Sequence, residues 1–243
     1  MITAIIQARL GSTRFPGKVL EYFSDNTLLG HIIERLKYSK HIRKIIVATT
    51  DSKIDDKLVD YLLKKNIDYF RGSENNVLDR FYNAAVKFNA EYILRVTSDD
   101  PFKDPKIIDD VIELFLNQKL DFAYNNNPVS FPEGLDVEVF TFDALKRAQI
   151  NAKNAFDREH VTQYFFKNPQ LFLQNNLKNE INYSNLRWTL DTLEDLKFTK
   201  EVYRRLYQNK KMFYFEDILK LLDKETEIGL INASVKRSYL YNN

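Results

Sequence analysis

Short β-branched segments alternate with longer amphipathic segments through the first half of this chain, and this alternation limits the fold more than any other feature. The predicted strands cover residues 2–8, 44–49, 68–71, 92–96 and 121–125. The predicted helices between them cover residues 28–38, 54–66, 77–88 and 105–116. Strands separated by helices of this length are typical of βαβ units and a parallel sheet. The sequence therefore predicts an α/β protein.

The pattern becomes less regular after residue 127. Further strands are predicted at residues 135–140, 172–177 and 185–190. Further helices are predicted at residues 144–151, 160–166, 193–207 and 216–222, followed by a polar tail. No repeat and no low-complexity linker interrupts the chain. We therefore expect a single domain over residues 1–243, with a mostly parallel sheet and a β-containing insertion.

The composition excludes several classes of protein. The chain has 243 residues, 44% of them hydrophobic and 29% charged, with a net charge of +2 and no cysteine. Disulfides, thiolate metal sites and a cysteine nucleophile are thereby excluded, and the bulk charge gives no support to nucleic-acid binding. No apolar run approaches the roughly 20 residues of a membrane span, and no secretory signal is evident. We expect a cytoplasmic enzyme with neither a nucleic-acid nor a membrane partner.

A loop suited to a polyphosphate follows the first predicted strand. It combines two glycines, two hydroxyls and three cations within residues 9–18. Small residues let backbone N–H groups approach phosphate oxygens, and fixed cations neutralise the charge. The residues expected to bind a nucleotide here are Ala8, Arg9, Gly11, Ser12, Thr13, Arg14 and Lys18. The alternative is a surface turn whose cations are merely solvated.

Aspartates follow two of the predicted strands. Asp99 comes after the strand at 92–96, and Asp191 after the strand at 185–190. Ligands are expected beyond the carboxyl ends of strands in such sheets, and carboxylate oxygens beside a triphosphate are how Mg²⁺ is held. Asp99 and Asp191 are thus the predicted magnesium ligands. Alternatively, each belongs to a turn or helix start, as Asp104 before Pro105 does.

Two other segments are candidates for binding. Arg71 ends the third predicted strand, and the turn at Gly72 and Ser73 that follows could read a base through backbone groups. The nucleotide-binding candidates in this part of the chain are Arg71, Gly72, Ser73, Arg80, Thr97 and Ser98. A capped helix with a surface ion pair is the alternative for that region. The candidates for binding an acceptor are Asp136, Glu138, Arg158, Glu159 and His160. The alternatives there are a solvated strand face and a structural histidine.

Several motifs resemble one family. Ile-Ile-Gln-Ala-Arg-x-Gly-Ser-Thr-Arg-x-Pro-Gly-Lys at 5–18, Gly-Leu-Asp-Val-Glu-Val-Phe at 134–140 and Leu-Arg-Trp-Thr-x-Asp-Thr at 186–192 recur in order. They are similar to the spore-coat polysaccharide biosynthesis (SpsF-like) cytidylyltransferases, a family related to the acylneuraminate and KDO cytidylyltransferases. One departure is Ser98, which stands where that family usually has glycine.

The resemblance implies a Rossmann-like, three-layer α/β/α nucleotidyltransferase fold of the GT-A type. It also implies CTP as donor, Mg²⁺ as cofactor, release of pyrophosphate and a homodimer. We expect residues 1–127 to bind the nucleotide and residues 128–222 to bind the acceptor and dimerise, with residues 223–243 as a C-terminal tail.

The predicted reaction is attack of an oxygen of a sugar or sugar-acid acceptor on the α-phosphorus of CTP, in surface polysaccharide biosynthesis. Its predicted catalytic residues are Arg9, Arg14, Lys18, Asp99 and Asp191. Two alternatives stay open at this point. One is a GT-A-type glycosyltransferase that uses a nucleotide-sugar, and the other is a non-catalytic nucleotide-binding module.

Overall fold

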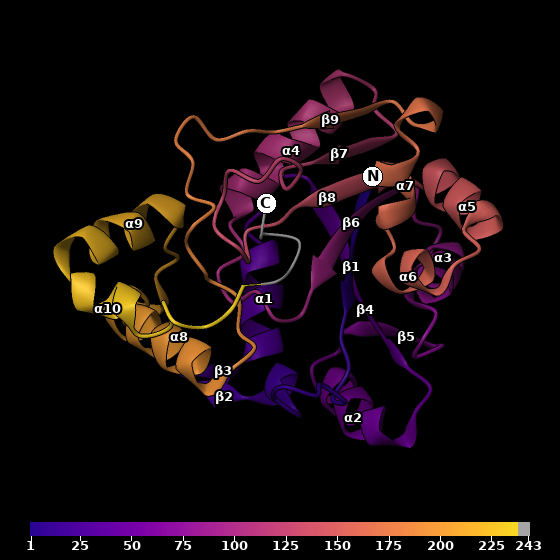
Figure 1. The fold of residues 1–243 in the computed structure, drawn as a ribbon. Coiled ribbons are helices and arrows are strands. Elements are labelled where there is room, and N and C mark those ends of the chain that lie inside the picture. Colours follow the sequence, from indigo (N-terminus) through magenta and orange to yellow (C-terminus); the bar gives the residue numbers. More distant parts are fainter. Residues whose placement is uncertain (238–243) are drawn as a thin grey trace.

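One seven-stranded sheet forms the centre of the computed structural model, which describes residues 1–237 (Figure 1). The strand order is β5-β4-β1-β6-β8-β7-β9. The strands are β1 (Ile2–Gln7), β4 (Ile42–Thr50), β5 (Asp68–Gly72), β6 (Tyr92–Thr97), β7 (Phe122–Tyr124), β8 (Glu138–Thr141) and β9 (Gln174–Asn176). β2 (Tyr22–Phe23) and β3 (Asn26–Thr27) pair separately.

The first four strands of the sheet are parallel, with β1 between β4 and β6. Ala4 pairs with Ile45 on one side and with Leu94 on the other. β8 runs antiparallel to both β6 and β7, and its Glu138 pairs with Arg95. The start of β8 therefore lies beside the carboxyl end of β6, where a parallel sheet places its ligands.

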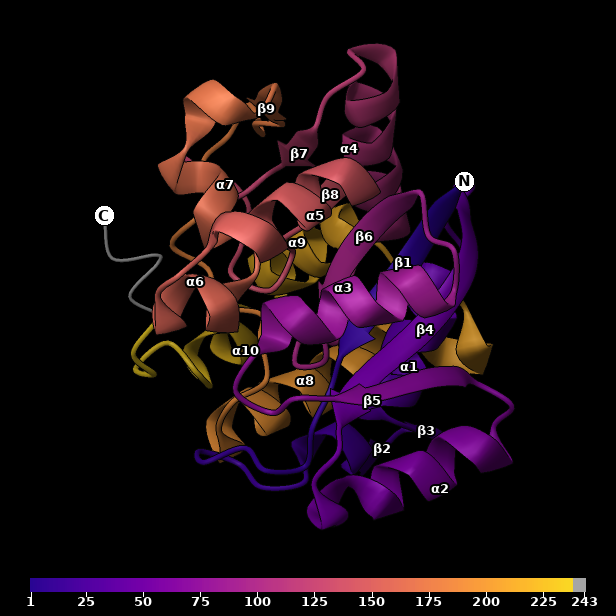
Figure 2. The same cartoon turned by 90° about the vertical axis from the view of Figure 1, so that its right-hand side faces the viewer.

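Helices cover both faces of the sheet, as the two views show (Figures 1 and 2). The longer helices are α1 (Leu28–Leu36), α2 (Asp56–Lys64), α3 (Val77–Lys87), α4 (Pro105–Asn117), α5 (Phe142–Asn151), α8 (Leu193–Leu206) and α9 (Phe215–Lys224). The shorter helices are α6 (Ala155–His160), α7 (Gln163–Lys167) and α10 (Thr226–Leu230), with 3-10 turns η1 (Lys18–Leu20), η2 (Lys53–Asp55), η3 (Pro169–Leu171) and η4 (Gln208–Lys210). The expected three-layer α/β/α fold with a mostly parallel sheet is confirmed. None of the helices in residues 1–237 has the length and apolarity of a membrane span.

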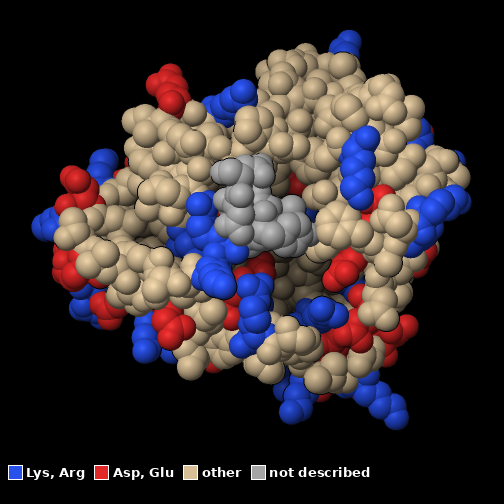
Figure 3. Space-filling view, viewed as in Figure 1, with Lys and Arg blue, Asp and Glu red and all other residues tan. Residues whose placement is uncertain are grey.

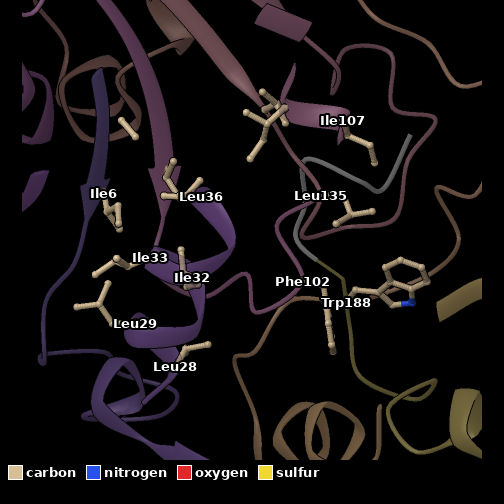
Figure 4. Packing of buried hydrophobic residues seen from close by; sticks show 14 of the residues in the cluster. Ile6, Leu28, Leu29, Ile32, Ile33, Leu36, Phe102, Ile107, Leu135 and Trp188 are labelled. Atoms are coloured by element: carbon tan, nitrogen blue, oxygen red, sulfur yellow. The ribbon is translucent and has the colours of Figure 1, made fainter. Parts of the chain in front are cut away.

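Two hydrophobic cores, one for each face, hold the layers together. α1 places Leu29, Ile33 and Leu36 at helical spacing against β1, where Ile6 lies close to them (Figure 4). The same core includes Trp188, which is 1% exposed and lies edge-on to Phe102 with ring centroids 6.2 Å apart. Apolar residues of α3, α5 and α7 form the second core with the other sheet face. Burial of apolar area on both faces explains why the strands have nearly continuous apolar sequences.

Three predictions about the second half are wrong. Residues 185–190 form no strand; a single bridge joins Arg187 to Glu133, because the Trp188 N–H donates to the Glu133 carbonyl while the Leu190 N–H donates to that of Asp99, outside any strand. The helix predicted at 160–166 is two helices, separated at Val161, whose φ is 53°. The predicted tail begins inside α9 and continues into α10, which buries Ile228; its residues 238–243 lie outside the described part.

Asp104 joins α4 to α9 and should be important for stability. Its Oδ1 accepts from the backbone N–H groups of Lys106 (2.8 Å) and Ile107 (3.3 Å), and its Oδ2 accepts from Phe215 N–H at 2.6 Å. The expected helix cap at Asp104 is thus confirmed. The same carboxylate satisfies a buried donor from a segment 111 residues away.

We predict that Asp104→Ala lowers the free energy of unfolding by about 2–4 kcal/mol, because a lost cap costs about 1 kcal/mol and an unpaired buried N–H costs about 1–3 kcal/mol. Urea denaturation measures the change. Asp110→Ala, at an exposed position of the same helix, is the matched control and should stay within about 0.5 kcal/mol of the parent. Equal losses for the two variants would contradict this role.

Candidate functional site

The cationic loop after β1 is anchored at both of its ends. Leu10 N–H donates to Asp55 Oδ1 at 2.6 Å, and Gly17 N–H donates to the Leu10 carbonyl at 2.9 Å. Gly17 has φ 75°, which few residues other than glycine adopt at low cost. This turn directs the chain into η1, so that Lys18 points toward the carboxyl edge of the sheet.

Lys18 joins three segments that are far apart in the sequence. Its Nζ donates to Asp99 Oδ2 at 3.0 Å, to Asp191 Oδ1 at 2.6 Å and to the Leu190 carbonyl at 3.0 Å. The Lys18 residue is only 7% exposed. The two carboxylates predicted to share a metal therefore do meet at one point, and an ammonium group holds them together.

Asp191 is also bound by two arginines. Arg14 Nη2 lies 2.8 Å from Asp191 Oδ2 at the surface, and Arg187 Nη2 lies 3.3 Å from the same oxygen in the interior. Arg187 further contacts Asp195 Oδ2 (2.9 Å) and Glu133 Oε1 (3.0 Å). The buried arginine thus fixes Asp191 from behind, while Arg14 reaches it from the solvent side.

The charges in this cluster are maintained near neutral pH. Burial alone would raise the pKa of Asp99, but the Lys18 ammonium and its hydrogen bond outweigh burial and lower that pKa to about 2. Burial alone would lower the pKa of Lys18, but Asp99 and Asp191 outweigh it and raise that pKa. Lys18 and Asp99 therefore stay an ion pair across the physiological range.

A cavity of about 520 Å³ opens in front of this cluster. The face drawn in Figure 3 is hollowed near its centre, and basic and acidic side chains gather around the hollow. The cavity lining includes the following predicted nucleotide-binding and catalytic residues: Ala8, Arg9, Ser12, Thr13, Arg14, Lys18, Arg80, Thr97, Ser98, Asp99 and Asp191. Four chain segments predicted separately from the sequence are therefore brought together: residues 8–18, Arg80, residues 97–99 and Asp191.

Some predicted nucleotide-binding residues lie elsewhere. Gly11, Arg71, Gly72 and Ser73 are not among the described residues that line this cavity. Arg71 instead donates to the carbonyls of Thr50 and Ser52, both at 2.8 Å, and so connects β5 to the loop after β4. The Ser73 carbonyl accepts from Arg80 Nη1 at 2.7 Å. The Arg71 guanidinium is thus bound to this loop, and the part of residues 71–73 in nucleotide binding stays a prediction.

Arg80 lies within the cavity wall at 3% exposure. Burial, together with the nearby positive charge of Arg9, lowers its pKa to about 10. Arg80 Nη1 also holds the loop before α3, because it donates to the Ser73 carbonyl. Neighbouring Glu74 and Asn75 line the same wall, with Glu74 Oε1 2.9 Å from Arg9 Nη1.

A second cavity of about 410 Å³ adjoins the first. Asp136 and Glu138 line it, as does His160. Thr97 and His160 line both cavities, so the two spaces meet at the carboxyl end of β6. The Arg158 guanidinium faces Gln149 of α5, 3.4 Å from the Gln149 carbonyl, and Arg158 is not among the described residues that line either cavity, so its part in acceptor binding stays a prediction. Glu159 lies in the wall of the first cavity, away from the second.

The walls of the second cavity are charged but internally paired. Arg95 Nη1 lies 2.5 Å from Glu138 Oε2, and Lys103 Nζ lies 2.8 Å from Asp100 Oδ2. Thr162 Oγ1 donates to Glu138 Oε1 at 3.0 Å. Polar side chains from Asn126 and Gln163, with the ring of Phe166, complete a lining that suits a polyhydroxylated molecule.

Val161 has a strained backbone at this site. Its φ of 53° is unusual for a β-branched residue, and its side chain is fully buried. The strain turns the chain so that the residues on either side, His160 and Thr162, both reach the second cavity. Such strain concentrates at functional sites.

Sequence reasoning missed Arg95, Lys103 and Arg187 as parts of the site. Arg95 lies within a strand, so a pattern of residues after strand ends does not include it. From the sequence, Lys103 is expected to be a solvated cation in a loop. In the structure it is 2% exposed and pairs with Asp100. Only the register that places Glu138 opposite Arg95 shows that these charges face one cavity.

The chemistry of the site fits a divalent cation at Asp99 and Asp191. Both carboxylates converge on one positive charge at 3.0 and 2.6 Å, and such hard oxygen donors suit Mg²⁺. Within residues 1–237 no group of three or more His, Asp or Glu side chains is placed to hold a metal ion. A metal at this point would therefore rely on ligands other than protein carboxylates and histidines as well.

Comparisons with known proteins agree with this geometry. The model of the cytidylyltransferase family matches residues 3–228. An uncharacterized protein of Methanocaldococcus jannaschii is 39% identical, over 97% of this chain and 96% of its own. The spore coat polysaccharide biosynthesis protein SpsF of Bacillus subtilis is 36% identical, over 84% of this chain and 87% of its own.

A solved structure is similar over the whole chain. The structure of a cytidylyltransferase from Leptospira borgpetersenii serovar Hardjo-bovis matches with a TM-score of 0.89 at 34% identity, covering 98% of each chain. The family model and this structure both extend across the phosphate loop, the Lys18 cluster and the two cavities. The SpsF-like resemblance is thereby confirmed, and the chain belongs to the cytidylyltransferase family.

Proposed function

We propose that this cytidylyltransferase moves CMP from CTP to a hydroxyl of a sugar or sugar-acid acceptor, with release of pyrophosphate, in surface polysaccharide biosynthesis. The observation that supports this most directly is the pair of adjoining cavities that share Thr97 and His160. The lining of the first cavity includes Arg9, Arg14, Lys18 and Arg80, and that of the second includes ion-paired and polar side chains. Two substrates in these cavities would meet at the carboxyl end of β6.

The first cavity would hold CTP. Arg9, Arg14 and Lys18 lie on one loop and would neutralise the β- and γ-phosphates as charge develops on the leaving pyrophosphate. Arg80 would add a fixed charge from the opposite wall. Catalysis by such a site depends on positioning and electrostatics rather than on a covalent intermediate. A glycosyltransferase that uses a nucleotide-sugar would have less need for a loop with three cations.

Mg²⁺ is the cofactor that we propose, held by Asp99 and Asp191. When bound, it would polarise the α-phosphate and orient the leaving group. The side chains of Arg14 and Arg187, which both contact Asp191, would keep that carboxylate in place.

The second cavity would hold the acceptor. Asp136 and Glu138 lie on its wall with His160 at the junction, so we propose that His160 accepts the proton of the attacking hydroxyl. Burial lowers the pKa of His160 below its usual 6.5, which keeps the imidazole neutral and able to take a proton near pH 7. We also propose a cytoplasmic location, where CTP is available, and a homodimer.

The test of the proposed function is pyrophosphate release with Mg²⁺, each of the four nucleoside triphosphates and a panel of acidic sugars and sugar phosphates. Release with CTP and one acceptor, with formation of the CMP-linked product, is the expected result. Binding of CTP without release across the whole panel would support a nucleotide-binding module instead.

We predict that Arg14→Ala lowers kcat about 10²–10³-fold, as loss of a group that stabilises developing charge does in other enzymes. The Arg14 side chain is 58% exposed, so the fold should remain intact by circular dichroism. Arg43→Ala removes an exposed arginine from β4 and is the matched control, with unchanged kcat. Parent-like turnover in Arg14→Ala would exclude this role for the loop.

The pH profile should report His160. With the pKa of His160 lowered by burial, kcat/KM should stay level through pH 7 and fall only below pH 6.5, as the imidazole becomes protonated. His160→Gln should lower kcat/KM and remove this acid limb. His41→Gln, which changes a histidine paired with Glu113 at the surface, should keep it. A limb that persists in His160→Gln would assign the proton to another group.

A further inference from the structure

The Lys18 ammonium occupies the point that a metal would need. Its three N–H donors have three oxygen acceptors: Asp99 Oδ2, Asp191 Oδ1 and the Leu190 carbonyl, at 3.0, 2.6 and 3.0 Å. An ammonium group has three donors and no more, so Lys18 is fully satisfied here. Two carboxylate oxygens and one carbonyl oxygen are also the type of donor that a hard divalent cation takes.

We propose that Lys18 keeps the metal site closed in the nucleotide-free enzyme and leaves it only when a triphosphate offers other anionic oxygens. This rests on the proposed function, since the triphosphate of CTP is what would attract Lys18 away. The ammonium and a divalent cation need the same oxygen atoms and carry charge of the same sign. They therefore exclude one another at this position.

The position of Lys18 allows such an exchange. Lys18 also lines the 520 Å³ cavity, together with Arg9 and Arg14 of the same loop. A lysine carries its charge on a flexible four-carbon chain, so the ammonium can move from the carboxylates to phosphate oxygens without unfolding η1. The phosphates would then replace the two carboxylates as its partners.

Arg187 determines which carboxylate keeps a cationic partner when Lys18 leaves. Arg187 is 6% exposed and holds Asp191 through Nη2, while Asp195 and Glu133 fix Arg187 itself. Asp191 therefore keeps a buried partner when Lys18 leaves. Asp99 has no second cation at ion-pair distance among the described residues, so its negative charge would be exposed to an incoming metal.

Ordered binding is the consequence. Without nucleotide, a metal must displace a satisfied ammonium that has no other anion to move to, and its affinity is low. With a triphosphate bound, Lys18 is neutralised elsewhere and the carboxylates become available. Nucleotide and metal then increase one another's affinity, as linkage requires.

The test is Mn²⁺ binding to the nucleotide-free chain, measured by electron paramagnetic resonance without acceptor or turnover. Lys18→Met should bind Mn²⁺ about tenfold or more tightly than the parent, and Mn²⁺ should raise the Tm of the variant but not of the parent. Lys44→Met is the matched control, because it removes another Lys–Asp pair, with Asp68 at 3.2 Å on the surface. It should bind Mn²⁺ as weakly as the parent.

Lys18→Gln provides a second variant in case Lys18→Met does not fold. The neutral amide of glutamine still donates hydrogen bonds to the buried carboxylates. Adding Asp99→Asn to either variant should abolish the gained Mn²⁺ site. Equal Mn²⁺ affinity in parent and variants, whether tight or absent, would overturn the exchange. A stoichiometric Mn²⁺ site at Asp99 in the nucleotide-free parent would by itself contradict the proposal. Pyrophosphate release plays no part in this measurement. A failure of the Lys18 proposal can therefore be distinguished from a failure of the proposed function.

Discussion

The ion pairs between Lys18, Asp99 and Asp191 determine how the rest of the site is arranged. They join the loop after β1, the end of β6 and the segment before α8, which are separated by 81 and 173 residues in the chain. Buried ion pairs add little net stability, but removing one partner is costly because a charge is left unpaired. The cluster therefore brings these three segments to one point while Lys18 keeps its partners.

The main strands and helices of the first half could be predicted because the residues of each one carry the apolar pattern that identifies it. β1, β4 and β6 are apolar runs with glycine-, serine- or aspartate-rich ends, and α1 and α4 begin at capping residues. The second half depends on partners far away. Residues 185–190 are as apolar as a strand, but the buried charge of Arg187 gives the segment a different role.

The same distinction applies to the site. Residues that follow strand ends, such as Arg14, Lys18 and Asp99, could be recognised because the sheet topology brings strand ends together. Arg95 could not, since its neighbours in the sequence give no sign of the Glu138 carboxylate that it meets. Lys103 could not, since a lysine three residues after Asp100 gives no sign that the two side chains are buried together. Arg71 could not be placed either, since only the fold shows that its guanidinium binds carbonyls of the chain after β4.

The reversed direction of β8 has a consequence for how such enzymes diversify. Because β8 runs against β6, the connection that precedes it, rather than the one that follows it, ends at the edge of the sheet where the parallel strands end. Residues 126–138 therefore supply part of the lining of the second cavity, while the loop after β1 supplies part of the lining of the first. The two cavities thus take much of their linings from different connections of one sheet, so an insertion or substitution in residues 126–138 can change the second cavity and leave the loop after β1 as it is.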